Sequence, residues 1–351
     1  MPEDNFNKLI ELISASDNIL LLPHVSADGD ALGSCGALCA FLDGMGKKAT
    51  VLVQEPVERR LCFLPRVSGV EYVLFDENYG EEEYDLAIAV DASTPDRLGT
   101  RVRLFDNARE KARIDHHAVG TDFAPLTLLD PAWSATAEGV YLLLNRMGFD
   151  RDNETPEWIT PELSKAVASC LYAAIVTDTG CFAYSNVTAM THYIASRLRA
   201  MAGNMSYVYH HVYEVKSVAY IRLMKAVYEK IEFPAEGIAL LVLTKEDFEA
   251  AGAGDEDAEG IANILRSIEG IHAGIFIKPD KVSGKFRVSM RSDSQCDVSK
   301  IAGEFGGGGH MCAAGCGITA FDDEMLNAEK ERLIGAAKKQ VNNIKLQIIC
   351  T

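Results

Sequence analysis

The stretch "NILLLPHVSADGDALGSCGALCAFLDGMG", residues 18–46, decides the class of fold. Its first part, residues 18–24, is a continuous apolar run that Pro23 brings to a close, which is typical of a strand buried in a parallel sheet. Its last part, residues 30–46, has the spacing of an amphipathic helix and ends in glycine. A short polar loop joins the two parts. The stretch therefore predicts the first strand–loop–helix unit of an α/β domain.

Strand-like and helix-like segments go on alternating after this unit. Further strands are predicted over residues 47–54, 70–76, 84–93, 112–117 and 124–131. Helices are predicted over residues 134–149 and 160–182, and a helical pattern continues over 188–203. Alternation of this kind predicts a doubly wound domain, in which a parallel sheet carries helices on both faces.

The second half of the chain restarts with strand signals after a helical stretch. Residues 272–292 predict two antiparallel strands, and residues 297–318 predict a helix, a glycine loop and the start of another helix. We therefore expect a catalytic domain over residues 1–204, a helical connector over 205–232 and a smaller α/β domain over 233–351. A cleft between the two domains is expected to hold the substrate.

The composition is that of an ordinary globular protein, with 48% hydrophobic and 24% charged residues in a chain of 351. The formal charge of −17 argues against a broad contact with duplex DNA, but it leaves room for a short anionic substrate. No apolar run is long enough for a membrane span, and the acidic N-terminus does not resemble a signal peptide. Nine cysteines without a C-x-x-C pair favour reduced thiols and a cytoplasmic location.

Four acidic or histidine clusters follow predicted strands or helices. Because ligands gather beyond the carboxyl ends of strands in an open α/β sheet, the clusters after strands are expected to converge. Taken singly, each cluster has a plainer explanation as a helix N-cap, a turn residue or a hydrogen-bonding helix end. The clusters are His24 with Asp28 and Asp30; Asp91; Asp115 with His116 and His117; and Asp178.

Taken together, the clusters predict a metal site. Crowded carboxylates repel one another unless a cation neutralises them, and carboxylates with imidazoles suit Mn²⁺, Mg²⁺ or Zn²⁺. The set is large enough for two ions with one aspartate as a bridge. Paired ions roughly 3.5–4 Å apart suit phosphoester hydrolysis, because they lower the pKa of a bridging water and neutralise phosphate oxygens.

The order of these motifs resembles the DHH phosphoesterase superfamily, which is named for its Asp-His-His motif. The similar segments are "HVSADGDALGS" (24–34), "VDAS" (90–93), "IDHH" (114–117) and "DTGCFAYSN" (178–186). The C-terminal segment "GEFGGGGHMCAAG" (303–315) is similar to the glycine-rich signature of the DHH-associated domain. The resemblance thus extends over nearly the whole chain.

The resemblance implies a role for each residue of the centre. His24 and Asp28 would hold one ion, and Asp30 and His116 would hold the other. Asp91 would bridge the ions, and Asp178 would complete the site. His117 would act near the leaving group or water, or brace the ligands, while Asp115 would lie behind the imidazoles and orient them. The implied ions are Mn²⁺, with Mg²⁺ or Co²⁺ as alternatives.

The second domain is expected to bind the part of the substrate that lies beyond the metal site. Consecutive glycines let backbone N–H groups approach an anion, and arginine can fork onto a phosphate or stack on a base. The plainer alternative is a flexible loop with a surface histidine and arginine. The residues expected to bind substrate are Gly306, Gly307, Gly308, Gly309, His310, Arg291 and Ser292.

Within the superfamily, the chain is similar to the stand-alone nanoRNase type. That resemblance implies hydrolysis of short oligoribonucleotides and of 3′-phosphoadenosine 5′-phosphate (pAp). The alternatives are a phosphodiesterase for pApA or cyclic dinucleotides, a polyphosphate or small phosphoester hydrolase, and a catalytically silent nucleotide-binding module. Expected partners are a short single-stranded RNA or small nucleotide, without duplex DNA or membrane, and a homodimer is expected from the resemblance alone.

Overall fold

The structure is a computed structural model that describes residues 3–76, 79–80, 82–151, 155–280, 282, 284–293 and 295–349. The chain divides into two compact units, residues 1–215 and 216–351, which are described separately. The predicted connector, residues 205–232, is divided between them, because its first part packs in the first unit and α9 (Val218–Lys230) belongs to the second. No described helix combines the length and the apolar character that a membrane span requires.

The first unit is built on a six-stranded sheet in which every pairing is parallel, which confirms the predicted α/β class. The strand order is β3-β2-β1-β4-β5-β6. The chain thus leaves β1 toward one edge of the sheet and β4 toward the other, which makes the β1/β4 border the topological switch point. The strands are β1 (Asn18–Pro23), β2 (Lys48–Val53), β3 (Tyr72–Leu74), β4 (Leu86–Val90), β5 (Glu110–Asp115) and β6 (Leu126–Leu129).

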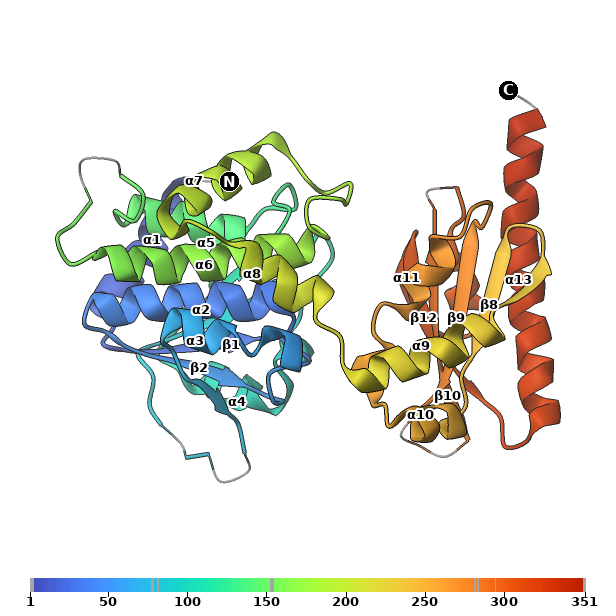
Figure 1. Ribbon diagram of the computed structural model, residues 1–351. Helices are drawn as coiled ribbons and strands as arrows, with labels where there is room; N and C mark the ends of the chain where they lie inside the picture. Colours follow the sequence, from blue (N-terminus) through green and yellow to red (C-terminus); the bar gives the residue numbers. More distant parts are fainter. Residues whose placement is uncertain are drawn as a thin grey trace. The chain divides into compact units, whose positions relative to one another are not determined.

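Helices cover both faces of this sheet unequally (Figure 1). The larger core packs α1, α2 and α5 against one face, α3 lies against α2 and α6, and α6 and α7 lie outside this layer. The smaller core packs α4 against the other face. The helices are α1 (Glu3–Ala15), α2 (Gly29–Gly44), α3 (Leu64–Ser68), α4 (Val102–Asn107), α5 (Thr136–Arg146), α6 (Pro161–Asp178), α7 (Ala189–Ala202) and α8 (Ser206–Tyr209).

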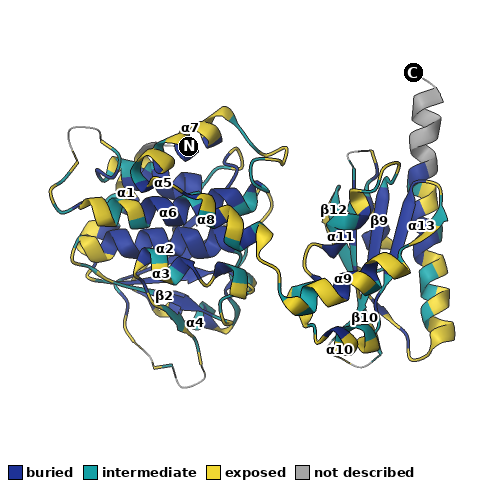
Figure 2. Ribbon diagram, in the orientation of Figure 1, coloured by how far each residue is buried: buried dark blue, intermediate teal, exposed yellow. Residues whose placement is uncertain are grey.

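Helix α2 differs from its prediction. The sequence pattern predicted an amphipathic helix, but every residue from Gly29 to Leu42 is buried (Figure 2). The reason is that α2 lies between the sheet and α6, so it has no solvent face over most of its length. Gly33 allows this packing, because a Cβ there would lie 2.6 Å from the Cys170 carbonyl oxygen of α6.

The second unit has a six-stranded sheet of order β11-β12-β10-β9-β8-β7, in which only β8 and β9 pair in parallel. Helices α9, α10 and α11 pack on one face, and α12 and α13 on the other. Its strands are β7 (Glu232–Ala235), β8 (Ile238–Val242), β9 (Ala273–Pro279), β10 (Lys285–Ser292), β11 (Gly308–His310) and β12 (Ala313–Thr319). Its remaining helices are α10 (Lys245–Ala251), α11 (Ile261–Arg266), α12 (Val298–Glu304) and α13 (Asp323–Ile349).

The segment after the four glycines is a strand, so the predicted helix start there is wrong. Residues 313–319 pair along their whole length with β10, and this long-range ladder overrides the helical spacing of small residues. The glycines form a tight hairpin with this strand. A Cβ at Gly307 would lie 2.2 Å from the Gly315 carbonyl oxygen, and one at Gly309 would lie 2.5 Å from that of Ala313.

Candidate metal centre

The six predicted metal ligands lie together at the carboxyl edge of the first sheet. His24 follows β1, Asp91 follows β4 and His116 follows β5, so three of them come from neighbouring strands at the switch point. Three groups of three have ligand atoms within 4.8 Å of one another, which is close enough to share an ion in each group. The groups are His24, Asp28 and Asp91; Asp30, His116 and Asp178; and Asp91, His116 and His117. The first two groups divide the six predicted ligands between them, and the third adds His117.

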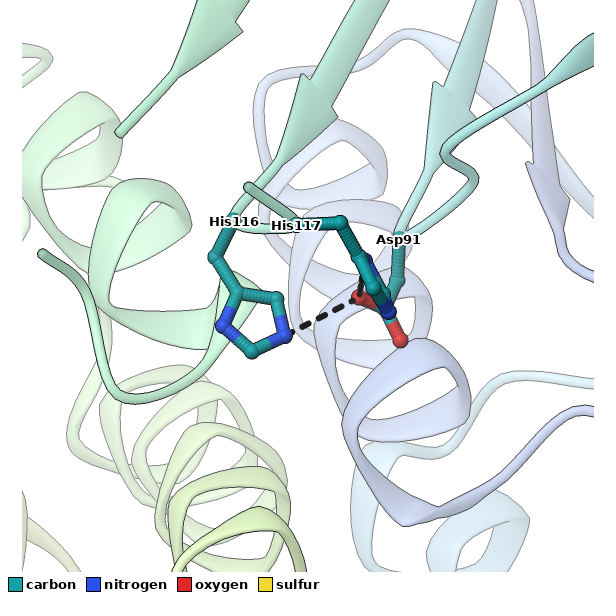
Figure 3. A group of neighbouring side chains, drawn as sticks. All are labelled: Asp91, His116 and His117. Atoms are coloured by element: carbon teal, nitrogen blue, oxygen red, sulfur yellow. Dashed lines mark ion pairs between the residues drawn. The ribbon is translucent and has the colours of Figure 1, made fainter. Parts of the chain in front are cut away.

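Asp91 belongs to two of the three groups. Its Oδ2 atom is 3.5 Å from Nε2 of His24, and its Oδ1 atom is 3.7 Å from Nε2 of His116. Figure 3 shows the imidazoles of His116 and His117 beside this carboxylate. Each oxygen of Asp91 therefore faces a different group, which is the geometry that a bridging carboxylate needs.

Backbone strain is concentrated in the same segments. Among the described residues, the non-glycine positions with positive φ are Ser26, Asp91, Cys181 and Phe182. Ser26 lies between the candidate ligands His24 and Asp28, Asp91 is the candidate bridge, and Cys181 and Phe182 follow Asp178 by three and four residues. Strained backbone of this kind persists only where the surroundings over-determine it, and it clusters at functional sites.

The first loop holds His24 and Asp28 in orientations that suit a cation. The Asp28 Oδ1 atom accepts the amides of Asp30 and Ala31 and caps α2, while Oδ2 lies 3.7 Å from Nε2 of His24. The N-cap and ligand interpretations of Asp28 are thus compatible, since each uses a different oxygen.

The tautomer of His24 decides whether it can bind a metal. Its Nδ1 atom lies 2.7 Å from the Val25 carbonyl oxygen, to which it can donate, and this leaves Nε2 as the ligand atom. The Arg97 guanidinium also lies 2.9 Å from Nδ1. It can donate there only when Nδ1 has no proton, and that neutral tautomer would block Nε2. The metal-binding state is therefore the one that uses Val25.

The Asp-His-His motif divides into residues with different surroundings. The Asp115 Oδ1 atom lies 2.7 Å from Nδ1 of His117 and also accepts the backbone amide of His116 at 2.9 Å. The ring of His116 is held instead by the Trp133 carbonyl oxygen, 3.2 Å from its Nδ1. Asp115 therefore orients one imidazole directly, where we expected it to orient both. Because Asp115 occupies Nδ1 of His117, Nε2 is the nitrogen of this ring that remains for an ion or a substrate.

Without a cation, the centre compensates its charge with protons. Burial lowers the pKa of His24, but Asp28 and Asp91 outweigh burial and raise it to about 10. Burial raises the pKa of the Asp178 carboxyl to about 7, with His116 opposing the shift and Asp91 adding to it. Burial and the charges of Asp91 and Asp178 also raise the pKa of Asp30.

These pKa values predict that metal binding releases protons. His24 and Asp178 must each lose a proton before they can bind a cation. Below pH 7 the cation therefore displaces protons from both residues, and above pH 7 mainly from His24. The apparent affinity should therefore rise with pH, by about tenfold per unit for each proton released, and more steeply below pH 7. Titration calorimetry with Mn²⁺ in buffers of different ionisation enthalpy measures the number of protons released per ion bound. Equal affinity at pH 6 and pH 8.5 would contradict this protonation scheme.

The predicted substrate-binding residues of the second unit lie in different settings. Arg291 lines a cavity of about 290 Å³ together with Asn263 and Lys278. Ser292 is buried, and its hydroxyl donates to the Cys296 carbonyl oxygen at 2.6 Å, so we leave it out of the candidate substrate site. His310 and the four glycines are exposed.

The first turn of α5 also reaches the centre, which we had not foreseen. The amides of Thr136 and Ala137 donate to Asp30, and the Ser34 hydroxyl lies 3.2 Å from the same carboxylate. The segment "WSATAE", residues 133–138, predicted a helix start and nothing more, because sequence periodicity does not show what a helix N-terminus points at.

The fold and the centre define an α/β protein with a carboxylate–imidazole cluster at the switch point of its first sheet, and comparisons identify two domains in the chain. The DHH family, N-terminal domain, matches residues 18–175, and the DHHA1 domain matches residues 237–343. The chain therefore carries a DHH family N-terminal domain and a DHHA1 domain, as the motifs had indicated.

Individual relatives are similar over nearly the whole chain. The bifunctional oligoribonuclease and PAP phosphatase NrnA of Thermus thermophilus is 29% identical over 92% of this chain and 90% of its own length. The crystal structure of an exopolyphosphatase-related protein from Bacteroides fragilis has a TM-score of 0.84 at 28% identity, and covers 96% of this chain and 98% of that one. The cyclic-di-AMP phosphodiesterase PdeA of Listeria monocytogenes is 26% identical over 93% of this chain and 48% of its own length.

Proposed function

We propose that the protein is a phosphoesterase with two divalent ions, Mn²⁺ in the first place, that hydrolyses short oligoribonucleotides and pAp. The observation that carries the proposal is the position of Asp91, whose two oxygens face two separate groups of candidate ligands. The donors are carboxylates and imidazoles, which suit Mn²⁺ better than the softer ions that prefer thiolates. Similarity to NrnA supports the substrate class.

The residues of the centre have separate tasks in hydrolysis. The ions would activate a water and neutralise charge on the phosphate oxygens. Asp91 fixes the spacing of the two ligand groups. His117, whose side chain is 39% exposed and braced by Asp115, lies where it can contact the phosphate or the departing sugar oxygen. The water oxygen bonds to phosphorus, the bond from phosphorus to the sugar oxygen breaks, and that oxygen takes up a proton.

Arg291 and His310, both in the second unit, are proposed to bind the substrate. Both residues pair with Ala313 of β12, Arg291 from β10 and His310 from β11. Directly opposed residues in an antiparallel ladder point to the same face, so both side chains rise from one face, two strand spacings or roughly 10 Å apart. The small Ala313 side chain between them leaves room for a bound group.

Two alternative substrates have support from particular relatives. Similarity to PdeA favours a dinucleotide such as pApA or a cyclic dinucleotide, and similarity to the Bacteroides fragilis protein favours a polyphosphate. Turnover of pAp, a labelled diribonucleotide, pApA, cyclic di-AMP and polyphosphate should be compared at equal concentration with Mn²⁺. We expect the diribonucleotide and pAp to have the highest kcat/KM. Faster turnover of polyphosphate than of both nucleotides would overturn the proposed substrate class.

Gly308 offers a test of the glycine loop. Neither its backbone angles nor a close neighbour requires a glycine, since φ is not positive and a Cβ would meet open space. Gly308→Ala should therefore leave the midpoint of thermal unfolding within about 2 °C while raising KM for the diribonucleotide several-fold, because the methyl group would obstruct an anion at the backbone. Gly307→Ala is the matched comparison, and should destabilise the second unit by its clash with Gly315. An unchanged KM in Gly308→Ala would remove the loop from the proposed site.

A further inference from the structure

The first turn of α5 contacts two carboxylates that come from two other elements. The Thr136 amide donates to Oδ2 of Asp30 at 2.6 Å, and the Ala137 amide donates to Oδ1 of Asp30 at 3.1 Å. The Thr136 hydroxyl donates to Oδ1 of Asp91 at 2.7 Å. Thr136 therefore links one candidate ligand of α2 with the candidate bridge at the end of β4.

Asp30 takes the place of a local helix cap. The residue at the N-cap of α5 is Ala135, which has no side chain to accept the first amides. These amides lack partners within a helix and carry the positive end of its dipole, so they stabilise a carboxylate. Asp30 is completely buried, and it is thus fixed by a rigid helix from a different part of the chain.

The hydrogen bond from the Thr136 hydroxyl leaves most of the Asp91 carboxylate free to bind cations. This bond uses one lone pair of Oδ1, so the other lone pair of Oδ1 and all of Oδ2 remain for cations. Asp91 has a φ of 60°, a strained conformation that neighbouring contacts must hold in place. Thr136 is itself completely buried, so its hydroxyl has no exchange with water that could replace this contact.

We infer that Thr136 is a positioning residue of the metal centre, whose hydroxyl fixes the orientation of the Asp91 carboxylate between the two ions. The inference rests on the proposed function. Thr136 acts through Asp91 and touches neither ion nor substrate. Loss of a group that orients a metal ligand typically lowers metal affinity roughly 10–100-fold.

The test compares variants of Thr136 by titration calorimetry with Mn²⁺ and by thermal unfolding without metal. Thr136→Val should bind Mn²⁺ at least about 10-fold more weakly, and Thr136→Ser, which keeps the hydroxyl, should stay within about 3-fold of the wild type. If Thr136→Val does not fold, Thr136→Ala removes the same hydroxyl without a methyl group against Asp91. The matched control is Thr191→Val, since Thr191 is equally buried and its hydroxyl donates to the Ser134 hydroxyl.

The outcomes separate this inference from the function on which it rests. Thr191→Val should lose thermal stability but keep the metal affinity of the wild type. Wild-type protein that binds no Mn²⁺ would reject the proposed function. Wild-type protein that binds Mn²⁺, with equal affinity in Thr136→Val, would reject the positioning role alone. A Thr136→Ser variant as weak as Thr136→Val would also reject it, because the hydroxyl would then not be the decisive group.

Discussion

Asp91→Asn is expected to lower kcat/KM for a diribonucleotide by on the order of 10³-fold or more. The amide keeps the shape of the side chain but replaces one anionic oxygen by an NH₂ group, which cannot bind a cation. Because the two oxygens of Asp91 face different ligand groups, the change should weaken both groups at once. Elemental analysis after dialysis against Mn²⁺ should show fewer ions per chain than in the wild type.

Asp150→Asn provides the control for this variant. Asp150 belongs to the same unit, its side chain is 6% exposed, and it forms an ion pair of 2.6 Å with Arg197. Its replacement should cost stability but leave metal content unchanged, since Asp150 contacts none of the candidate ligands. Wild-type activity and metal content in Asp91→Asn would refute the bridging role.

His116→Ala and His117→Ala are expected to differ in their effects on metal content. His116→Ala should lose bound metal, because Nε2 of His116 faces both Asp91 and Asp178. His117→Ala should keep its metal, because the two groups that contain the six predicted ligands are complete without His117. Its kcat should nevertheless fall by about 10²–10⁴-fold, the usual effect of removing a positioned group that moves a proton.

Metal content and kcat, measured together, decide this prediction. The second unit contains a matched pair, His272 and Asp293, with Nδ1 and Oδ2 2.6 Å apart and a similar exposure of the imidazole. His272→Ala should leave both quantities unchanged. Equal loss of metal in His116→Ala and His117→Ala would mean that both histidines are ligands.

The sequence was most informative where the chain forms buried parallel strands. The apolar runs of β1 and β4 were recognisable as buried strands. Because ligands lie beyond the carboxyl ends of such strands, His24 and Asp91 could be predicted to lie close together. Burial of β1 on both faces explains why its signal was continuous. The family resemblance added the roles of the residues.

The sequence was least informative where long-range contacts decide the structure. The small residues of β12 have a helical spacing, but their pairing with β10 makes the segment a strand. The apparent amphipathic pattern of α2 did not reveal that α6 covers its outer face. Thr136 was missed for the same reason. Its two acceptors, Asp30 and Asp91, lie 106 and 45 residues away in the chain.

Two cations are proposed to bind on either side of Asp91. Anomalous diffraction from crystals grown with Mn²⁺, collected above the manganese absorption edge, tests this most directly. We predict two peaks roughly 3.5–4 Å apart, one near His24 and Asp28, the other near His116 and Asp178. A single peak, or no peak within coordination distance of the Asp91 carboxylate, would contradict it.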